Sequence, residues 1–269
     1  MAQGVAVVKG WNRFISDIVF LGAGASKSEG APLQGELFEK YFQDVAGTTG
    51  LADFEQDVAT FFQRCFGIDS REPSTLAKGF PTFEEALGVL ELALQRGESF
   101  RARSASALNP QLQRVRERLV FLIALVLEKS LTEGGKHHRA LVERLSREGT
   151  LRRTTFLTSN YDILIDNALI EAFPDFDLDY GVEFTNPERE GDWSRPRKGK
   201  AISLHKLHGS LNWLYCPTSG SMTLTPGDKR VAKLVFSPQP CENCEALVIP
   251  IIIPPTFFKV MSNFHLQSI

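Results

Sequence analysis

The sequence has few cysteines and no hydrophobic run long enough to cross a membrane. Only 4 of its 269 residues are cysteine, too few for a disulfide framework in a chain of this length. The longest apolar runs, Leu119–Leu127 and Ala246–Ile253, are much shorter than the ~20 residues of a membrane-spanning helix. The N-terminus shows no apolar core of a signal peptide. These features predict a protein of the reducing cytoplasm that does not enter a membrane.

The sequence also lacks an excess of charge of one sign. Lysine and arginine number 30 and aspartate and glutamate 32, which leaves a net charge of −2 and no global attraction to nucleic acid. Basic residues cluster at 101–103, 114–118 and 195–200, but aromatic residues are not interleaved with them. We interpret these clusters as solvated helix faces and loops. Strong nucleic-acid binding by this chain alone is therefore not expected.

What the sequence does contain is a series of short apolar segments typical of buried strands. Asp17–Leu21 and Thr154–Leu157 run directly into polar motifs, residues 202–207 form a third segment and residues 247–253 a fourth. Continuous apolar runs of this length suit strands buried on both faces of a parallel sheet. A content of 43% hydrophobic and 23% charged residues fits a soluble protein with one sizeable core.

Helical spacing of apolar residues separates these strands. Thr82 and Glu85 form a capping box for one of the helices. The fold class predicted is α/β: a Rossmann-like parallel sheet flanked by helices, in a single domain over residues 1–269, with an inserted, mostly helical module at about residues 50–150. The predicted helices cover residues 33–41, 54–66, 83–94, 112–131, 137–148 and 163–169, and the charged residues 183–200 are predicted to form an exposed loop.

A glycine-containing loop follows the first predicted strand. Glycines let the backbone approach a pyrophosphate closely, and the free N–H groups of the following helix face its negative charge. The full dinucleotide motif has a third glycine where this chain has Lys27, so a glycine turn without a ligand remains an alternative for this segment. The candidate binding residues of the loop are Gly22, Ala23, Gly24, Ala25 and Ser26.

Three polar residues stand at the ends of later predicted strands. Asn160 and Asp162 follow the second strand, and His208 follows the third. Each alone has a structural interpretation, since Asn-x-Asp often caps a helix and a single histidine is often part of a core. In an open parallel sheet, however, ligands bind beyond the carboxyl ends of the strands. The shared placement predicts that all three residues gather beside the glycine loop.

These motifs, taken together and in order, resemble the sirtuin-like NAD-consuming superfamily, and most closely its bacterial branch of anti-phage defence proteins. The resemblance spans almost the whole chain. The motifs that carry it are residues 22–26 with Gly30 and Pro32, residues 158–162 (Thr-Ser-Asn-Tyr-Asp), residues 206–213 (Lys-Leu-His-Gly-Ser-Leu-Asn-Trp) and residues 253–256 (Ile-Pro-Pro-Thr).

The resemblance implies an NAD⁺ glycohydrolase that yields nicotinamide and ADP-ribose and acts in antiviral defence by draining NAD⁺. It places the glycine loop around the phosphates and ribose, Asn160 at the ribose and a water molecule, and Asp162 in the network on the nicotinamide side. His208 would accept a proton, as an imidazole can near neutral pH. The further NAD⁺-binding residues implied are Pro32, Ser159, Gly209 and Ser210.

The chain departs from the family pattern in two of its motifs. Pro32 is followed by residues 33–35 (Leu-Gln-Gly) instead of the Asp-Phe-Arg of deacylases, which argues against deacylation and for attack by water. The family's four-cysteine zinc module is reduced to three cysteines, because Ser219 occupies the fourth position. Zinc normally takes four ligands, so zinc is disfavoured, and a degenerate ribbon-like insertion at about residues 214–246 is expected instead. The cysteines concerned are Cys216, Cys241 and Cys244.

The resemblance also implies a continuation past residues 254–255, with elements that contact the adenosine half of NAD⁺. We therefore expect the domain to be incomplete at its C-terminus, with self-association or a larger defence complex supplying the rest. Two alternatives stay open from the sequence. One is a protein deacylase or ADP-ribosyltransferase on the same fold, and the other is a non-catalytic module that senses NAD⁺ or another nucleotide for a partner.

Overall fold

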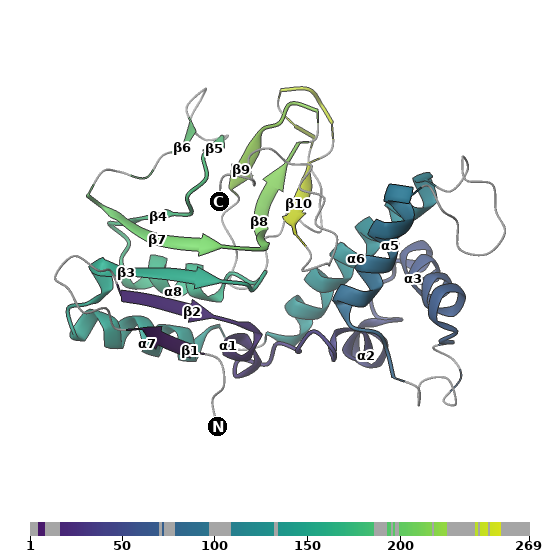
Figure 1. Cartoon of the computed structure of the whole chain (residues 1–269), viewed down its shortest axis with the longest axis horizontal. Coiled ribbons are helices and arrows are strands. Elements are labelled where there is room, and N and C mark those ends of the chain that lie inside the picture. Colours follow the sequence, from purple (N-terminus) through teal and green to yellow (C-terminus); the bar gives the residue numbers. More distant parts are fainter. Residues whose placement is uncertain are drawn as a thin grey trace. The chain divides into compact units, whose positions relative to one another are not determined.

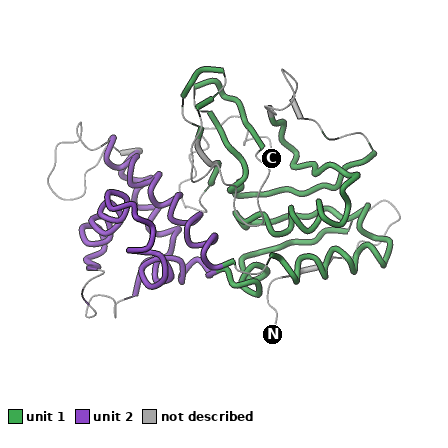
Figure 2. Tube along the Cα trace, turned by 180° about the vertical axis from the view of Figure 1, so that it is seen from behind, with its two compact units in different colours: residues 1–31, 131–253, 261–269 green, residues 32–130, 254–260 purple. Residues whose placement is uncertain are grey.

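The chain divides into two compact units, which Figure 2 shows in different colours. Unit 1 takes in the described residues up to Ala31 and those from Leu131 to Ile253, and unit 2 those from Pro32 to Ser130. Of the motif at residues 253–256, only Ile253 is among the residues that the structure describes. The computed structural model describes residues 5–8, 17–69, 72, 79–96, 109–131, 134–185, 193–194, 196, 199–216, 218–224, 240–241, 243–246 and 248–253.

A sheet in the order β1-β2-β3-β7-β4 forms the centre of unit 1 (Figure 1). Its parallel strands are β2 (Asp17–Leu21), β3 (Thr154–Thr158), β7 (Ala201–Lys206) and β4 (Asp177–Asp179). The predicted Rossmann-like α/β fold is confirmed by this parallel arrangement. β1 (Val5–Val8), which the sequence did not predict, pairs antiparallel with β2 at the edge.

Helices cover the face of this sheet that carries the core. α7 (Lys136–Arg147) and α8 (Leu164–Ala172) place apolar side chains against the inward residues of β2, such as Val19. On the opposite face Ile18 and Phe20 are 40% and 39% exposed. The prediction that this strand is buried on both faces is therefore wrong: it alternates, as a strand covered on one side does.

A second, antiparallel sheet follows the last parallel strand. β8 (Gly209–Tyr215) lies between β10 (Ile249–Ile252) and β9 (Met222–Leu224). Six of the seven residues of β8 are buried, and Trp213 is 0% exposed. Trp213 belongs to the same hydrophobic cluster as the inward residues of the parallel sheet. One core therefore supports both sheets of unit 1.

Residues 183–200, predicted as an exposed loop, contain a short ladder. β5 (Phe184–Thr185) and β6 (Trp193–Ser194) pair antiparallel, with Phe184 opposite Ser194. The Phe184 side chain is 2% exposed and contacts the Trp213 ring, at 5.5 Å between ring centroids. The loop prediction is wrong at this point because an apolar contact from a distant strand outweighs the charged local sequence.

The described part of unit 2 is helical. A π-helical turn, η1 (Tyr41–Val45), directly continues α2 (Leu37–Lys40). The Thr82/Glu85 capping box is confirmed, because the Glu85 N–H donates to the Thr82 hydroxyl at 3.2 Å and the Thr82 N–H to the Glu85 carboxylate at 2.7 Å. Aromatic rings fill the core, for example Phe38 against Phe62 at 4.6 Å between centroids. The α-helices are α2 (Leu37–Lys40), α3 (Ala52–Phe66), α5 (Phe83–Arg96) and α6 (Asn109–Ser130).

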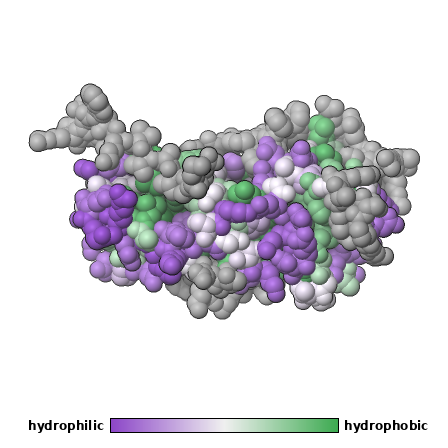
Figure 3. All heavy atoms as spheres, turned by 90° about the horizontal axis from the view of Figure 1, so that it is seen from below, coloured by the Kyte–Doolittle hydropathy of each residue, from purple (hydrophilic) through white to green (hydrophobic). Residues whose placement is uncertain are grey.

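The surface agrees with the amphipathic pattern of the helices. α7 buries His138, Val142 and Leu145 and turns charged residues outward, and the view from below in Figure 3 shows mainly hydrophilic residues. Among the described residues, no helix is both long and apolar enough to cross a membrane. A one-turn 3₁₀ helix, η3 (Leu151–Arg153), leads from α7 into β3.

Candidate functional site

The glycine-containing loop begins where β2 ends. Gly22 precedes α1 (Ala23–Lys27) in an extended conformation, with φ −98° and ψ −176°. Among the described residues, a Cβ added at Gly22 would meet within 4 Å only the Phe20 ring, at 3.9 Å. The fold itself therefore tolerates a side chain here. Glycine at this position keeps the backbone open to close approach by another molecule.

A chain of hydrogen bonds joins this loop to the segment that follows β3. The side-chain amide of Asn160 donates to the Gly22 carbonyl at 3.0 Å and to the Ser26 hydroxyl at 2.8 Å. The Ser26 hydroxyl in turn donates to Oδ2 of Asp162 at 2.6 Å. Ser26 and Asp162 are 2% and 5% exposed, so these bonds form away from bulk water, where they are stronger. Two predicted motifs, more than 130 residues apart, thus meet.

The bonds decide which atoms of this network can face a ligand. Both amide hydrogens of Asn160 are used by Gly22 and Ser26, so its Oδ1 oxygen is the atom left to accept a hydrogen bond from a hydroxyl or a water. Oδ1 of Asp162 accepts the Leu164 N–H at 3.1 Å, at the start of α8. With both oxygens engaged, the Asp162 carboxylate holds Ser26 and the first turn of α8.

A buried ion pair between Lys206 and Asp166 stabilises the segment that carries Asp162. Nζ of Lys206 donates to the Asp162 carbonyl at 2.5 Å and to Oδ2 of Asp166 at 3.0 Å, and both side chains are at most 2% exposed. The Tyr180 hydroxyl donates to Oδ1 of Asp166 at 2.7 Å. Burial and the Asp166 charge hold the pKa of Tyr180 well above its ordinary value of 10.0, so the hydroxyl keeps its proton.

Sequence reasoning gave Lys206 no role, although a signal was present. Residues at positions 202, 204 and 206 alternate with outward ones along β7 and are all buried. A lysine at an inward position of a strand needs a buried carboxylate nearby. Asp166 supplies that carboxylate, four residues after Asp162 in the sequence.

His208 lies at the same end of the sheet. It follows β7, and the residue before it, Leu207, donates its N–H to the Thr158 carbonyl at the end of β3, at 2.9 Å. The His208 ring is half-buried, and its centroid lies 6.4 Å from that of the Tyr161 ring. Tyr161 stands between Asn160 and Asp162 in the sequence. The His208 carbonyl accepts the Ile253 N–H at 2.9 Å. These contacts fix the backbone that carries the imidazole.

Gly209 and Ser210 serve the packing of β8 against β10. Gly209 has φ +78°, and an added Cβ would lie 2.2 Å from the Ile251 carbonyl oxygen, so glycine is required there on two counts. The Ser210 hydroxyl is completely buried and donates to Oδ1 of Asn212 at 2.6 Å. Contact of either residue with a dinucleotide stays a prediction.

The other predicted binding residues are distributed over both units. Ser159 is half-buried and donates its N–H to the Leu21 carbonyl at 3.2 Å. Pro32 is the first residue of unit 2, whereas all the others belong to unit 1. Their contact with NAD⁺ also stays a prediction. The remaining loop residues Ala23, Gly24 and Ala25 are exposed or half-exposed.

Glu29, which the sequence did not single out, anchors the exit of the loop. Its carboxylate is 2% exposed and accepts the N–H groups of Lys136 at 3.1 Å and His137 at 2.5 Å, the first residues of α7. A carboxylate at a helix N-terminus is favoured by the unpaired N–H groups and the helix dipole. The turn after α1 is thereby tied to the helix layer.

A hollow of about 470 Å³ lies elsewhere, between α7 and α8. None of the predicted site residues lines it. Charged side chains of both signs form its wall, and it does not belong to the site described above. Its lining includes Arg139, Glu143, Arg147, Glu171 and Phe173.

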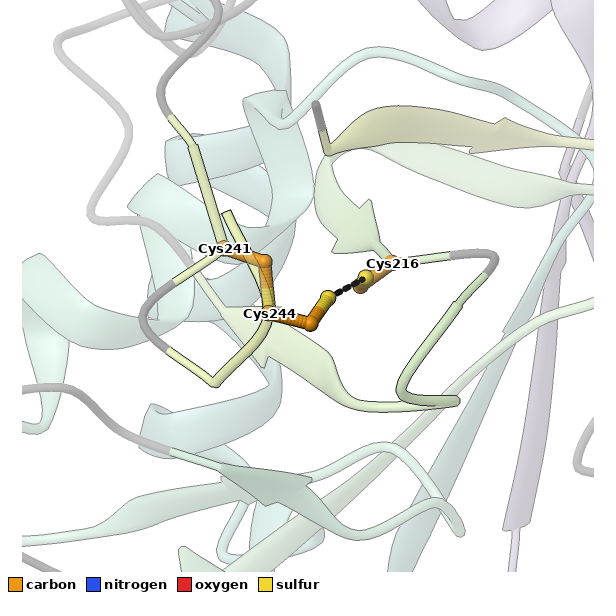
Figure 4. A group of neighbouring side chains, drawn as sticks. All are labelled: Cys216, Cys241 and Cys244. Carbon is orange, nitrogen blue, oxygen red and sulfur yellow. Dashed lines mark hydrogen bonds between the residues drawn. The ribbon is translucent and has the colours of Figure 1, made fainter. Parts of the chain in front are cut away.

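Three cysteines converge beyond the far end of β8. The Sγ atoms of Cys216, Cys241 and Cys244 all lie within 4.8 Å of one another, and those of Cys216 and Cys244 are 3.4 Å apart. Figure 4 shows the three side chains pointing toward one another. A hydrogen bond with the Ser219 hydroxyl is the main cause that lowers the pKa of Cys241 to about 6. The three side chains thus bring together sulfur atoms of the kind that zinc binds in proteins.

Fold and site together define a Rossmann-like α/β domain with a polar cluster at the carboxyl edge of its parallel strands. No family model matches the chain, and no curated protein matches it. Among solved structures it is similar to a mutant Sir2 homologue in complex with 2′-O-acetyl ADP ribose, at 18% identity and a TM-score of 0.33. The match covers 88% of this chain and 58% of that chain. Likeness at this level does not establish a family, so the fold class rests on the strand order.

Proposed function

We propose that this chain binds NAD⁺ and hydrolyses its nicotinamide–ribose bond. The observation that carries the proposal is the link from Gly22 through Asn160 and Ser26 to Asp162, with contacts of 2.6 to 3.0 Å. It draws a glycine loop and an amide oxygen together at the carboxyl ends of neighbouring strands. That is where open α/β sheets bind nucleotides.

The residues can be assigned roles that fit the chemistry of this bond. Nicotinamide leaves as a neutral group, so no strong acid is needed, and the barrier lies in the positive charge that develops on the ribose. Positioned dipoles lower such a barrier. In the proposed site Oδ1 of Asn160 faces the ribose or the attacking water, and the His208 imidazole accepts the proton. Asp162 acts by holding Ser26.

A role in antiviral defence by depletion of NAD⁺ is the biological setting that the motif resemblance favours. In that setting the chain works within a larger assembly. Self-association or a partner subunit would then control when NAD⁺ is consumed.

A non-catalytic NAD⁺-sensing module is the second candidate. The observation that favours it is that the Asp162 carboxylate is already engaged: Asp162 is 5% exposed and both of its oxygens accept hydrogen bonds within the protein. A carboxylate held in this way stiffens a binding loop, and stiffening alone suits recognition without turnover.

The test is incubation of the 269-residue chain with NAD⁺, with nicotinamide and ADP-ribose separated by chromatography. We expect hydrolysis by the wild type, a loss of about 10² to 10⁴-fold in His208→Ala, the range typical of a general base, and a loss of about 10² to 10³-fold in Asn160→Ala, the range typical of a positioned dipole. Calorimetry with NAD⁺ separates binding from turnover. Binding without products supports the sensing module, whereas the absence of both binding and turnover refutes the proposal.

Matched controls exist within unit 1. Asn167 is a half-buried asparagine on α8 and His137 an exposed histidine on α7. Asn167→Ala and His137→Ala remove the same chemical groups outside the site and should leave turnover unchanged. Normal hydrolysis in both site variants would show that the site has been assigned to the wrong residues.

A further inference from the structure

The side chain of Tyr161 turns away from the glycine loop that its two neighbours contact. Asn160 and Asp162 stand on either side of Tyr161 in the sequence, and both bond to Ser26 through their side chains. The Tyr161 hydroxyl instead donates to the Ile253 carbonyl at 3.4 Å, directly after β10. Tyr161 thus connects the segment after β3 to the antiparallel sheet.

The residue that Tyr161 contacts there also holds the backbone of His208. The Ile253 N–H donates to the His208 carbonyl at 2.9 Å, and the Ile253 carbonyl accepts the Tyr161 hydroxyl. The rings of Tyr161 and His208 lie 6.4 Å apart between centroids, with their planes tilted by 42°. Tilted ring pairs are favourable at centroid distances of about 4.5 to 7 Å. Ile253 therefore fixes the backbone of His208, and the Tyr161 ring lies beside its imidazole.

The backbone of Tyr161 is itself anchored on β8. Its carbonyl accepts the Leu211 N–H at 3.0 Å and lies 3.5 Å from the Ser210 hydroxyl. Although Tyr161 is aromatic, it is half-buried and does not belong to the hydrophobic cluster described for unit 1. Filling of that core therefore does not account for an aromatic ring at this position.

We propose that Tyr161 is a positioning residue, which holds the His208 imidazole in the orientation in which it faces the same ribose as Oδ1 of Asn160. The inference rests on the proposed NAD⁺ hydrolysis, because that reaction gives the imidazole its task. A proton acceptor works only within hydrogen-bond reach of the proton that it takes. Gly22 and Ser26 hold the amide of Asn160, and the Tyr161 ring does the corresponding work for the imidazole.

Steady-state hydrolysis of NAD⁺ tests this role in variants with and without the ring. In Tyr161→Leu we expect kcat to fall roughly 10-fold, the upper end of what one aromatic pair contributes. KM should stay unchanged, because the contact that is lost does not involve the substrate. Phenylalanine keeps the ring and removes only the hydroxyl, so Tyr161→Phe should retain most of kcat. Tyr161→Met is a second variant without the ring, and the same result as for Tyr161→Leu is expected.

Nuclear magnetic resonance of isotope-labelled histidine observes the imidazole without any turnover. The chain has 5 histidines, and comparison with His208→Ala assigns the signals of His208. The ring current of an aromatic side chain shifts the resonances of protons beside it. The ring-proton signals of His208 should therefore move in Tyr161→Leu and stay close to their wild-type positions in Tyr161→Phe.

Tyr215→Leu is the matched control, since Tyr215 is a half-buried tyrosine on β8 in unit 1. It should leave kcat and the His208 signals unchanged, and circular dichroism shows for each variant whether the fold is retained. The inference is overturned if Tyr161→Leu keeps the kcat of an active wild type, if Tyr161→Phe loses as much as Tyr161→Leu, or if the His208 signals do not move in Tyr161→Leu. A wild type without turnover refutes the proposed hydrolysis instead, and the His208 signals then decide whether Tyr161 orients the imidazole.

Discussion

Replacement of Lys206 by methionine should strongly destabilise unit 1. Methionine keeps most of the side-chain length but removes the buried cation. In Lys206→Met the Asp166 carboxylate, 2% exposed, keeps its Tyr180 hydrogen bond of 2.7 Å but loses its counter-charge, and the Asp162 carbonyl loses a donor. Removing one partner of a buried ion pair costs about 3 to 5 kcal/mol, a large fraction of the ~5 to 15 kcal/mol that holds a domain folded.

Tryptophan fluorescence during urea unfolding is the assay for this variant. Trp213 is completely buried in the core of unit 1, so the change in its fluorescence reports on the unfolding of this unit. A second variant, Lys206→Met combined with Asp166→Leu, removes both charges and should recover much of the lost stability, because an apolar pair of similar volume avoids the desolvation cost.

The refuting results are equally concrete. A cost below about 1 kcal/mol in Lys206→Met would mean that the carboxylate finds water or another partner, contrary to its burial. The single variant Asp166→Leu completes the comparison. If the free-energy changes of Lys206→Met and Asp166→Leu add up to that of the double variant to within ~0.5 kcal/mol, the two side chains do not interact.

Two further predictions concern stability. Gly209→Ala should lower the free energy of unfolding in urea by at least about 2 kcal/mol more than Gly199→Ala. Both glycines have similar positive φ (78° and 76°), but only at Gly209 would the new Cβ meet a backbone atom, at 2.2 Å. Equal losses in the two variants would refute the close approach of β10. Tyr180→Phe should flatten the alkaline loss of stability: the unfolded chain releases the tyrosine proton above its ordinary pKa of 10.0 while the folded chain retains it. The contribution of Tyr180 to the free energy of unfolding is thus complete below pH 10 and falls above it by about 1.4 kcal/mol per pH unit. Unfolding of the wild type and of Tyr180→Phe at a series of alkaline pH values measures this difference.

Local sequence patterns predicted most helices and three of the four parallel strands described, β2, β3 and β7, but not β4. The capping box placed the start of α5 within one residue, and the apolar steps of α3 and α6 predicted both helices to within three residues at each end. These features depend on neighbours within one or two turns, so the period of the apolar residues is enough to predict them. The grouping of Asn160 with Ser26 followed from one further rule, the alignment of strand ends in a parallel sheet.

Other features depended on contacts that no local pattern records. The edge strand β1, the ladder between β5 and β6, and the single-sided burial of β2 each follow from which distant segment packs against the strand. Sequence reasoning treated Ser219 as a missing zinc ligand, whereas the fold directs its hydroxyl toward Sγ of Cys241 at 3.4 Å.

The sequence by itself determined the fold class, the loop at Gly22 and the order of the polar motifs, because each of these depends on residues close together along the chain. Only the tertiary structure decided that Lys206 neutralises a buried carboxylate and that Asp162 is occupied with Ser26. The physical reason is desolvation: a charge becomes costly, and its partner necessary, only when folding removes both from water.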